Sequence, residues 1–376
     1  MAFLCASCGQ HYANDSGRWC CECGGLLEPA ERTVFQTAVI ERGEFSLWRY
    51  RKLLPLPEGA EPVSLGEGWT PIVSLELAGR PLQLKLEFLA PSGSFKDRGT
   101  SVLVSALRAL GVGQVVEDSS GNAAASLAAY AARAGIEAQI CVPAYTSPAK
   151  LRQIEVYGAR TIRVPGPREQ AGERARQLAG ETKAYYASHV YSPWALAGLK
   201  TFVYELWEQL GEKLPEWLIY PVGQGTFLYG SYLGLCELKE AGLIRRLPRL
   251  VAVQAERCAP LWAAFAEHSP TQIVEQERQS TGPTIAEGIA MRSPVRLEQV
   301  VRALRRTGGQ VVTVSEEEIY RAQQELAHQG LYVEPTSAAA LAGWQRLRES
   351  LPADEPVLLP LTGSGLKSAK QISSGE

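Results

Sequence analysis

The amine of Lys96 is the group in this sequence best placed for covalent chemistry. It lies in the segment Pro91-Ser-Gly-Ser-Phe-Lys-Asp-Arg-Gly99, just before a helical pattern over residues 101–110. The start of a helix carries partial positive charge, which helps to lower the pKa of a nearby ammonium group toward that of a usable nucleophile. We therefore expect Lys96 to be able to form a Schiff base with a carbonyl compound.

Three further segments place glycines with hydroxyl or amide side chains where a strand pattern ends. They are Ser119-Ser120-Gly121-Asn122, Gly223-Gln224-Gly225-Thr226 and Leu361-Thr362-Gly363-Ser364. The first offers hydrogen bonds to an anion or a ring oxygen, and the second has backbone amides that can cradle a phosphate. The third offers neutral hydroxyl donors. Each segment alone also fits an ordinary turn of an α/β protein.

Two cysteine pairs at the start of the chain have the spacing of a metal site. Cys5-x-x-Cys8 and Cys20-x-x-Cys23 can each present two sulfurs to one tetrahedral ion, and zinc is the expected metal. Cys21 is an alternative to Cys20, and loop geometry favours Cys20. A segment of about 30 residues buries too little apolar surface to fold alone, so the ion would be structural. The other interpretation is a frayed tail of reduced cysteines.

The length of 376 residues predicts two large domains and a small attachment, since a domain typically has roughly 150 residues. We expect a zinc ribbon at 1–30, an N-terminal α/β domain at 31–190 that carries Lys96, and a C-terminal α/β domain at 191–376 that carries the phosphate loop. Alternating strand and helix patterns predict a doubly wound parallel sheet in both large domains. Strands are expected at 82–86, 114–117, 138–142, 217–221, 250–254 and 357–361, and helices at 101–110, 123–134, 228–241, 316–329 and 338–350.

The charge balance argues against several classes of partner. Lys and Arg number 38 and Asp and Glu 40, so the net charge is −2 and no strong field attracts nucleic acid or an acidic membrane surface. The uncharged run Trp217–Cys236 has the length of a membrane span, but its prolines and glycines indicate a buried strand, a loop and a helix. The first residues lack the pattern of a secretory signal. A cytoplasmic protein is expected.

The segment Ser92–Gly99 followed by Ser119–Asn122 resembles the fold type II pyridoxal phosphate enzymes, and within them the threonine synthases. The cysteine cluster agrees with this resemblance, as do the stretches Gly198–Thr201, Thr284–Ile289 and Glu334–Ala340. The likeness extends over nearly the whole chain. It implies pyridoxal phosphate as cofactor, a small amino acid as substrate and a homodimer.

The resemblance also implies roles for the cofactor-binding residues. Lys96 would hold the cofactor and later move the α-proton, and Asn122 would bond the pyridine 3-oxygen. The hydroxyl of Thr362 would face the pyridine nitrogen. The loop around the cofactor phosphate would consist of Gly223, Gln224, Gly225 and Thr226.

Two groups of residues are candidates for binding the substrate. Ser119, Ser120 and Gly121 match a loop that receives the substrate carboxylate in this fold. Lys200 and Arg160 could partner a substrate phosphate, as a point charge and a bidentate fork respectively. The sequence differs from that of many threonine synthases at Ala90 and at residues 192–195, and these differences bear on recognition of the substrate phosphate. Lys200 and Arg160 are therefore considered as its partners.

The implied reaction converts O-phosphohomoserine and water to threonine and phosphate by β,γ-replacement. A serine or threonine dehydratase, or another β-replacing enzyme, is the alternative on the same scaffold, and a ribbon-type binding protein with an inactive enzyme body is a third interpretation. The four histidines, His189 among them, share no motif and are assigned no catalytic role.

Overall fold

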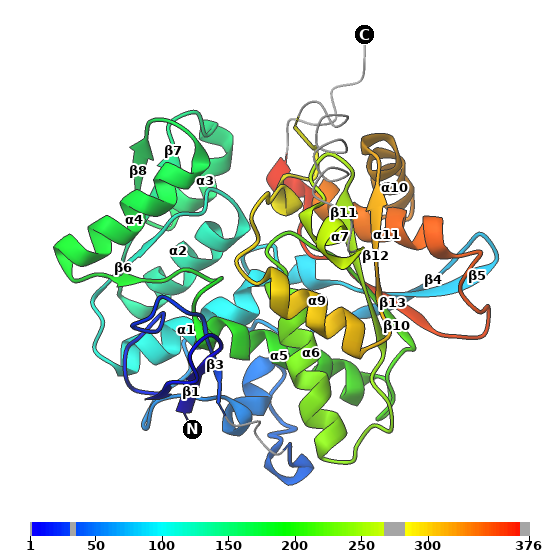
Figure 1. Ribbon diagram of the computed structural model, residues 1–376, viewed down its shortest axis with the longest axis horizontal. Helices are drawn as coiled ribbons and strands as arrows, with labels where there is room; N and C mark the ends of the chain where they lie inside the picture. The colour runs from blue at the N-terminus through cyan, green and yellow to red at the C-terminus, as the bar shows by residue number, and fades with distance from the viewer. Residues whose placement is uncertain (1, 31–34, 267–282, 369–376) are drawn as a thin grey trace. The chain divides into compact units, whose positions relative to one another are not determined.

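The computed structural model describes residues 2–30, 35–266 and 283–368, and the chain divides into two units (Figure 1). Unit 1 consists of residues 1–69 and 90–205, and unit 2 of residues 70–89 and 206–376. The helix α5 (Pro193–Gln209) begins in unit 1 and ends in unit 2. Both units have the predicted α/β character.

The units differ from the predicted domains because of one strand pairing that is distant in sequence. Residues 70–89 form the antiparallel hairpin of β4 (Ile72–Leu77) and β5 (Arg80–Lys85). The strand β5 pairs in parallel with β13 (Val357–Pro360) of unit 2. The strand expected at 82–86 therefore exists, but it belongs to the second sheet and not to the N-terminal domain.

Unit 1 contains a four-stranded parallel sheet in the order β8-β7-β6-β9. Its strands are β6 (Gln114–Glu117), β7 (Glu137–Pro143), β8 (Arg160–Val164) and β9 (Tyr185–Tyr186). Alternate side chains face opposite sides, so Val115 packs with α1 (Lys96–Ala109) and α2 (Asn122–Ala134), whereas Val116 packs with α4 (Arg168–Thr182). The short helix α3 (Pro148–Val156) lies between β7 and β8 in the chain. The sheet is thus covered on both faces, as the sequence predicts.

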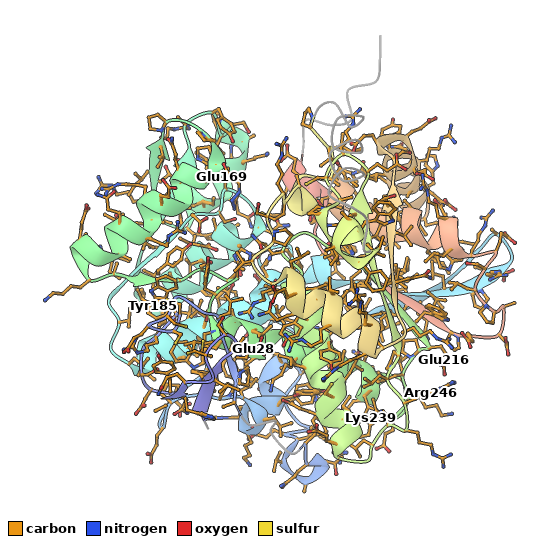
Figure 2. All side chains as sticks on the ribbon, viewed as in Figure 1. Glu28, Glu169, Tyr185, Glu216, Lys239 and Arg246 are labelled. Atoms are coloured by element: carbon orange, nitrogen blue, oxygen red, sulfur yellow. The ribbon has the colours of Figure 1, made fainter. Side chains whose placement is uncertain are left out.

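The cysteine-rich segment, residues 2–30, packs onto the rest of unit 1. Its strands β1 (Ala2–Cys5), β2 (His11–Ala13) and β3 (Leu27–Pro29) form an antiparallel sheet in the order β2-β1-β3. Phe3 is fully buried, and its ring lies 5.4 Å from that of Trp194. Tyr185, labelled in Figure 2, donates a hydrogen bond from its hydroxyl to the carbonyl oxygen of Arg18. The short helices η1 (Thr37–Val39) and η2 (Leu47–Leu53) follow.

Unit 2 contains a six-stranded sheet in the order β12-β11-β10-β13-β5-β4, parallel except for β4. Its remaining strands are β10 (Trp217–Pro221), β11 (Arg249–Ala255) and β12 (Gln310–Val314). Its helices are α6 (Thr226–Glu240), α7 (Pro260–Phe265), α9 (Leu297–Arg306), α10 (Glu316–His328) and α11 (Pro335–Leu347), with the short η3 (Glu87–Leu89), η4 (Glu287–Ile289) and η5 (Gly365–Ser368).

Local sequence explains several of these elements. A capping box begins α10, in which the Ser315 side chain accepts from the Glu318 backbone and the Glu318 side chain accepts from the Ser315 backbone. The alanine-rich helix α11 packs closely on the strands of the sheet. The uncharged run from Trp217 forms β10, a loop and most of α6, as predicted. Among the helices that the structure describes, none is both long and apolar enough to cross a lipid bilayer.

Candidate active site

Lys96 is the first residue of α1, so the structure places its amine at the helix N-terminus as predicted. The residue is partly buried, and its Nζ atom lies 4.7 Å from the centroid of the Phe95 ring. Phe95 occupies the N-cap position and makes no side-chain capping bond. The turn before it passes through Gly93, whose φ of +85° favours glycine. This turn lets the chain enter α1 with Lys96 partly exposed.

The neighbouring Asp97 ties the loop before Lys96 to α2. Its buried carboxylate accepts hydrogen bonds from the backbone N–H and the hydroxyl of Ser92, and from the hydroxyl of Ser126 at 2.6 Å. Several donors to one buried carboxylate offset the cost of removing its charge from water. The loop that presents Lys96 is therefore held to a second helix.

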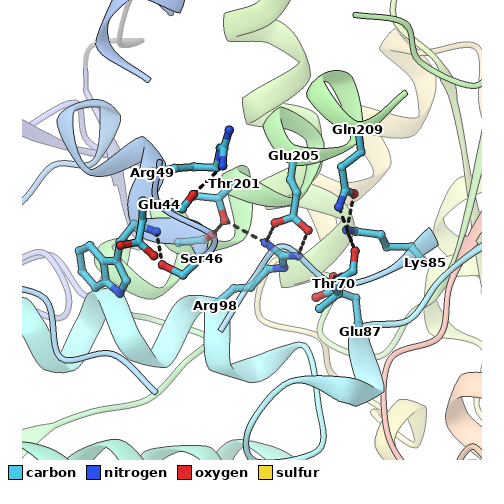
Figure 3. A network of polar contacts seen from close by, with 12 residues as sticks. Glu44, Ser46, Arg49, Thr70, Lys85, Glu87, Arg98, Thr201, Glu205 and Gln209 are labelled. Atoms are coloured by element: carbon cyan, nitrogen blue, oxygen red, sulfur yellow. Dashed lines mark hydrogen bonds and ion pairs between the residues drawn. The ribbon is translucent and has the colours of Figure 1, made fainter. Parts of the chain in front are cut away.

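A buried ion pair fixes α1 against α5. Both guanidinium terminal nitrogens of Arg98 donate to the carboxylate of Glu205, at 2.8 and 3.0 Å, and the two side chains are almost fully buried (Figure 3). A fork of two parallel hydrogen bonds sets the orientation of both partners. Gly99 allows the close approach, because a Cβ atom there would lie 2.7 Å from the carbonyl oxygen of Ala195.

The segment Ser119–Asn122 connects β6 to α2. The backbone N–H of Gly121 donates to the Ser119 hydroxyl at 3.2 Å, and Asn122 is the first residue of α2. Gly121 occupies the N-cap position of α2 and so provides no side-chain cap. Ser119, Ser120 and Asn122 are partly buried and Gly121 is exposed. A helix start with this composition can bind an external anion through its backbone amides.

The structure also brings two residues together that the sequence did not single out. Glu117, the last residue of β6, lies next to His189, and His189 Nδ1 is 2.8 Å from Glu117 Oε1. The only local signal in the sequence that Glu117 belongs to the site is its position, at the end of an apolar strand and directly before Asp118 and the Ser119 turn. Assigning His189 no role therefore overlooked a contact between residues that are 72 apart in the chain.

The two candidate partners of a substrate phosphate have different environments. Lys200 lies on α5 with its side chain fully buried, which is unusual for a lysine and argues against a simple surface charge. Arg160 is exposed at the start of the edge strand β8, and β7 separates this strand from β6. The structure does not bring Arg160 to the Ser119 turn.

In unit 2, the predicted phosphate loop lies between β10 and α6. Gly225 is the N-cap of α6 with φ of +78°, and a Cβ atom on it would lie 2.3 Å from Val300 Cγ2. Gly223 is equally confined, because its Cβ would lie 2.9 Å from the carbonyl oxygen of Gly288. Gln224 holds the loop by accepting from the Val295 backbone at 2.9 Å. Without a side-chain cap on α6, its first amides suit a phosphate.

Thr362 lies two residues after the end of β13 and is buried. Its backbone N–H donates to the Ser337 hydroxyl at 2.8 Å, while its own Oγ1 has no hydrogen-bond partner among the described residues. Thr336, which precedes Ser337 in the chain, accepts a hydrogen bond at Oγ1 from the backbone N–H of Gly288 at 2.9 Å. Gly288 in turn packs against Gly223. A buried hydroxyl without a partner is costly unless a ligand completes its bonding. The residues present thus fit a ligand that offers a hydrogen-bonding atom to Thr362.

The cysteine-rich segment gathers four sulfurs, with one difference from the prediction. The sulfur atoms of Cys5, Cys8, Cys21 and Cys23 all lie within 4.8 Å of one another. The pairs Cys5–Cys23 and Cys8–Cys21 are each separated by 3.6 Å. Cys21 thus takes the place expected for Cys20, because the backbone N–H of Cys21 bonds to the Gly25 carbonyl and closes the turn at that residue.

Comparison with known proteins identifies relatives of this chain. The sequence profile of a family described as pyridoxal-phosphate dependent enzyme matches residues 63–363. A threonine synthase of Methanocaldococcus jannaschii is 35% identical over 381 residues, which cover 98% of this chain and 93% of the relative. A threonine synthase of Methanosarcina acetivorans is 33% identical over 381 residues, which cover 98% and 92%.

The fold also has counterparts among solved structures. Maize serine racemase matches with a TM-score of 0.66 and 23% sequence identity, over 79% of this chain and 88% of that one. At this identity the likeness establishes a shared fold.

Proposed function

Since this chain belongs to the pyridoxal-phosphate dependent enzyme family, we propose that it converts O-phosphohomoserine and water to threonine and phosphate. The observation that carries the proposal is the identity of 33–35% with threonine synthases over 98% of the chain. The buried and unsatisfied hydroxyl of Thr362 and the amine of Lys96 at a helix start are the groups that such an enzyme needs.

The proposal assigns each part of the cofactor to residues of this chain. Lys96 would hold the aldehyde carbon, and the Asn122 amide would bond the ring oxygen. The backbone amides of Gly223, Gln224, Gly225 and Thr226 would take the phosphate, and Thr362 would bond the ring nitrogen. Support comes from the close approaches that only glycine permits at Gly223 and Gly225. When bound, pyridoxal phosphate supplies an electron sink for a carbanion at the substrate α-carbon.

The residues of the chain would then supply the proton transfers. The amine of Lys96 would be the base that takes the α-proton of the substrate. Loss of a second proton from Cβ would expel phosphate from the γ-carbon of the substrate. Protons would return to Cγ and Cα, and water would add at Cβ, so that the overall change is O-phosphohomoserine plus water to threonine plus phosphate. Thr362 would make the cofactor a weaker electron sink. Its neutral hydroxyl would not keep the ring nitrogen protonated, as a carboxylate would.

Substrate binding is assigned to unit 1. Ser119, Ser120 and Gly121, at the uncapped start of α2, would hold the substrate carboxylate. Lys200 is the preferred partner for the substrate phosphate, and its burial supports this choice over Arg160. A buried ammonium binds an anion more strongly than an exposed one, because water screens it less.

We also propose a structural zinc ion bound by Cys5, Cys8, Cys21 and Cys23. Four thiolates at about 2.3 Å from a tetrahedral ion lie about 3.8 Å apart, close to the 3.6 Å found for two of the sulfur pairs. Four ligands leave no open position, so the ion would stabilise the segment and take no part in catalysis.

The proposal extends to the cellular setting. None of the eight cysteines, all of which lie in the described ranges, forms a disulfide, and this fits a reducing compartment such as the cytoplasm. A homodimer is proposed from the family resemblance alone.

Product analysis tests the proposed reaction. The purified protein with pyridoxal phosphate and O-phosphohomoserine should release threonine and phosphate in equal amounts. Lys96→Ala should lose at least about 1,000-fold in rate, whereas Lys239→Ala, at an exposed position near the end of α6 (Figure 2), should not. Borohydride should attach the cofactor to a peptide that contains Lys96. Release of a keto acid and ammonia from serine or threonine, with no turnover of O-phosphohomoserine, would instead identify a dehydratase.

A further inference from the structure

Glu117, which is buried, and His189, which is partly buried, form an acid–imidazole pair that the proposed mechanism does not use. Glu117 ends β6, and His189 lies three residues after β9, the neighbouring parallel strand. The backbone N–H of Ala187 donates to the Val116 carbonyl at 2.8 Å and extends the pairing of the two strands. The contact of 2.8 Å between His189 Nδ1 and Glu117 Oε1 is thus held by the sheet itself. It lies at the carboxyl end of the strands, where parallel sheets bind ligands.

The surroundings of Glu117 favour its protonated form. Its side chain is 2% exposed, and Oε2 has no hydrogen-bond partner in the part of the chain that the structure describes. Burying a carboxyl oxygen that has no hydrogen-bond partner costs far less free energy when the group is protonated than when it is a charged carboxylate. Burial raises the pKa of Glu117 to about 8, and the nearby charge of Asp118 raises it too, although the charge of Lys96 lowers it.

His189 is held in its neutral form. The side chain is 19% exposed. Burial lowers the pKa of His189 well below its usual range, and the positive charges of Lys96 on α1 and Arg168 on α4 lower it further. In the resulting state the Glu117 carboxyl donates its proton to Nδ1, and Nε2 carries the ring hydrogen.

We propose that Glu117 and His189 form a one-proton acid–base pair at the carboxyl end of the sheet, whose ionisation shifts the protonation equilibrium of the Lys96 amine. The proposal rests on the role of Lys96 as the cofactor-holding lysine. When the pair ionises, the Nε2 proton leaves to water, the carboxyl proton moves to Nδ1, and a carboxylate remains. No other reactant is needed. The residues act through Lys96, so they are positioning residues.

The coupling with Lys96 works in both directions. The charge of Lys96 affects the pKa of both Glu117 and His189, so by linkage their ionisation affects the amine equally. While the pair is neutral, it adds no negative charge that would hold a proton on Lys96. Once Glu117 ionises, the new charge favours the protonated amine. The charges of Asp118 and Arg168 act on Glu117 in opposite directions.

Infrared spectroscopy of the cofactor-free protein tests the proton on Glu117 directly. The wild-type protein at pH 6.5 should show the carbonyl stretch of a buried protonated carboxyl group, and this band should disappear with a midpoint near pH 8. Glu117→Gln should lack the band, and Glu169→Gln, at an exposed residue of α4 labelled in Figure 2, should keep it. Absence of the band from the wild-type protein at pH 6.5 would overturn the proposal. Because this measurement needs no cofactor, it is independent of the proposed reaction.

A spectral titration tests the coupling to Lys96. The cofactor-loaded protein, without substrate, should change its visible absorption with pH, and the midpoint should fall by at least about half a pH unit in Glu117→Gln. Glu117→Asp, which keeps a titratable carboxyl, should restore part of the shift, and Glu169→Gln should leave the wild-type value. An equal midpoint in the wild type and both Glu117 variants would refute the coupling. A protein that binds no cofactor would refute the assignment of Lys96 and leave the infrared result standing.

Discussion

Gly198 of α5 lies directly against Arg98 of α1, since a Cβ atom on Gly198 would be 2.2 Å from the Arg98 carbonyl oxygen. This oxygen belongs to the helix backbone and cannot swing aside as a flexible side chain would. Lys96 is two residues away on the same helix. The position of the Lys96 backbone therefore depends on the absence of a side chain at Gly198 of a second helix.

Gly198→Ala should separate α1 from α5. We expect it to lower the free energy of unfolding by about 1–3 kcal/mol and to weaken the binding of pyridoxal phosphate, because overpacking displaces the backbone. The matched control is Gly180→Ala in α4, where no atom lies within 4 Å of the added Cβ. That variant should be neutral or slightly stabilised. Equal stabilities of the two variants in urea unfolding would contradict the close contact.

The ion pair of Arg98 and Glu205 predicts a larger effect on stability. Glu205→Gln leaves the buried guanidinium without its charged partner, so the free energy of unfolding should fall by about 3–5 kcal/mol. Glu181→Gln removes a partner of Arg174 from an exposed pair, and the expected change is below about 1 kcal/mol. Denaturant unfolding measures both. A small change for Glu205→Gln would mean that other groups compensate Arg98.

Residues whose position depends on their near neighbours in the chain could be predicted from the sequence. Lys96 begins α1 as expected, since the glycine-rich turn and the helical pattern adjoin in the chain. The strands at 114–117 and 217–221 match residue for residue, because an apolar run bounded by turn residues determines them locally. The glycine loop between β10 and α6 also follows from local signals, because Gly225 directly precedes the helix, and its role toward a phosphate stays a prediction.

Contacts between distant residues could not be predicted in this way. The hairpin of β4 and β5 joins unit 2 by pairing with β13, about 270 residues later, and no local pattern encodes that choice. The contact of Glu117 with His189 likewise depends on the adjacency of β6 and β9. The burial of Lys200 follows from the packing of α5 and not from its own sequence.

The cysteine-rich segment allows a direct test of its ligand set. Cys21→Ser should abolish the binding of about one zinc ion per chain and destabilise residues 2–30, because three thiolates remain. Cys20→Ser should retain the metal, since this sulfur lies outside the group of four. Elemental analysis of both purified variants gives the answer. Metal loss in Cys20→Ser alone would restore the assignment made from the sequence.

Thr362→Val should have opposite effects on the cofactor-free and cofactor-loaded protein. The substitution removes a buried hydroxyl that has no partner among the described residues, so the cofactor-free protein should be as stable as the wild type or more stable. It should bind pyridoxal phosphate about 10-fold more weakly, because one hydrogen bond to the ligand is lost. Thr362→Ser keeps the hydroxyl and should bind as the wild type does. Unchanged affinity in Thr362→Val would place the ring nitrogen elsewhere.

The raised pKa of Glu117 predicts how stability depends on pH. Between its ordinary pKa near 4.5 and its folded value of about 8, the folded protein retains a proton that the unfolded chain has lost. The free energy of unfolding therefore falls as pH rises through this range and levels off above about pH 8. His189 adds an opposite slope just above pH 6.5, because the unfolded chain still binds part of a proton there and the folded protein does not, and this contribution ends about one pH unit higher.

Glu117→Gln removes this dependence while keeping a similar shape. The stability of the variant relative to the wild type should therefore increase by about 1–2 kcal/mol between pH 6.5 and pH 8, at up to about 1.4 kcal/mol per pH unit. Urea unfolding of the cofactor-free proteins at several pH values measures the difference, and Glu169→Gln serves as the control with no such trend. A constant difference between the wild type and Glu117→Gln over this range would show that Glu117 is already ionised in the folded protein at pH 6.5.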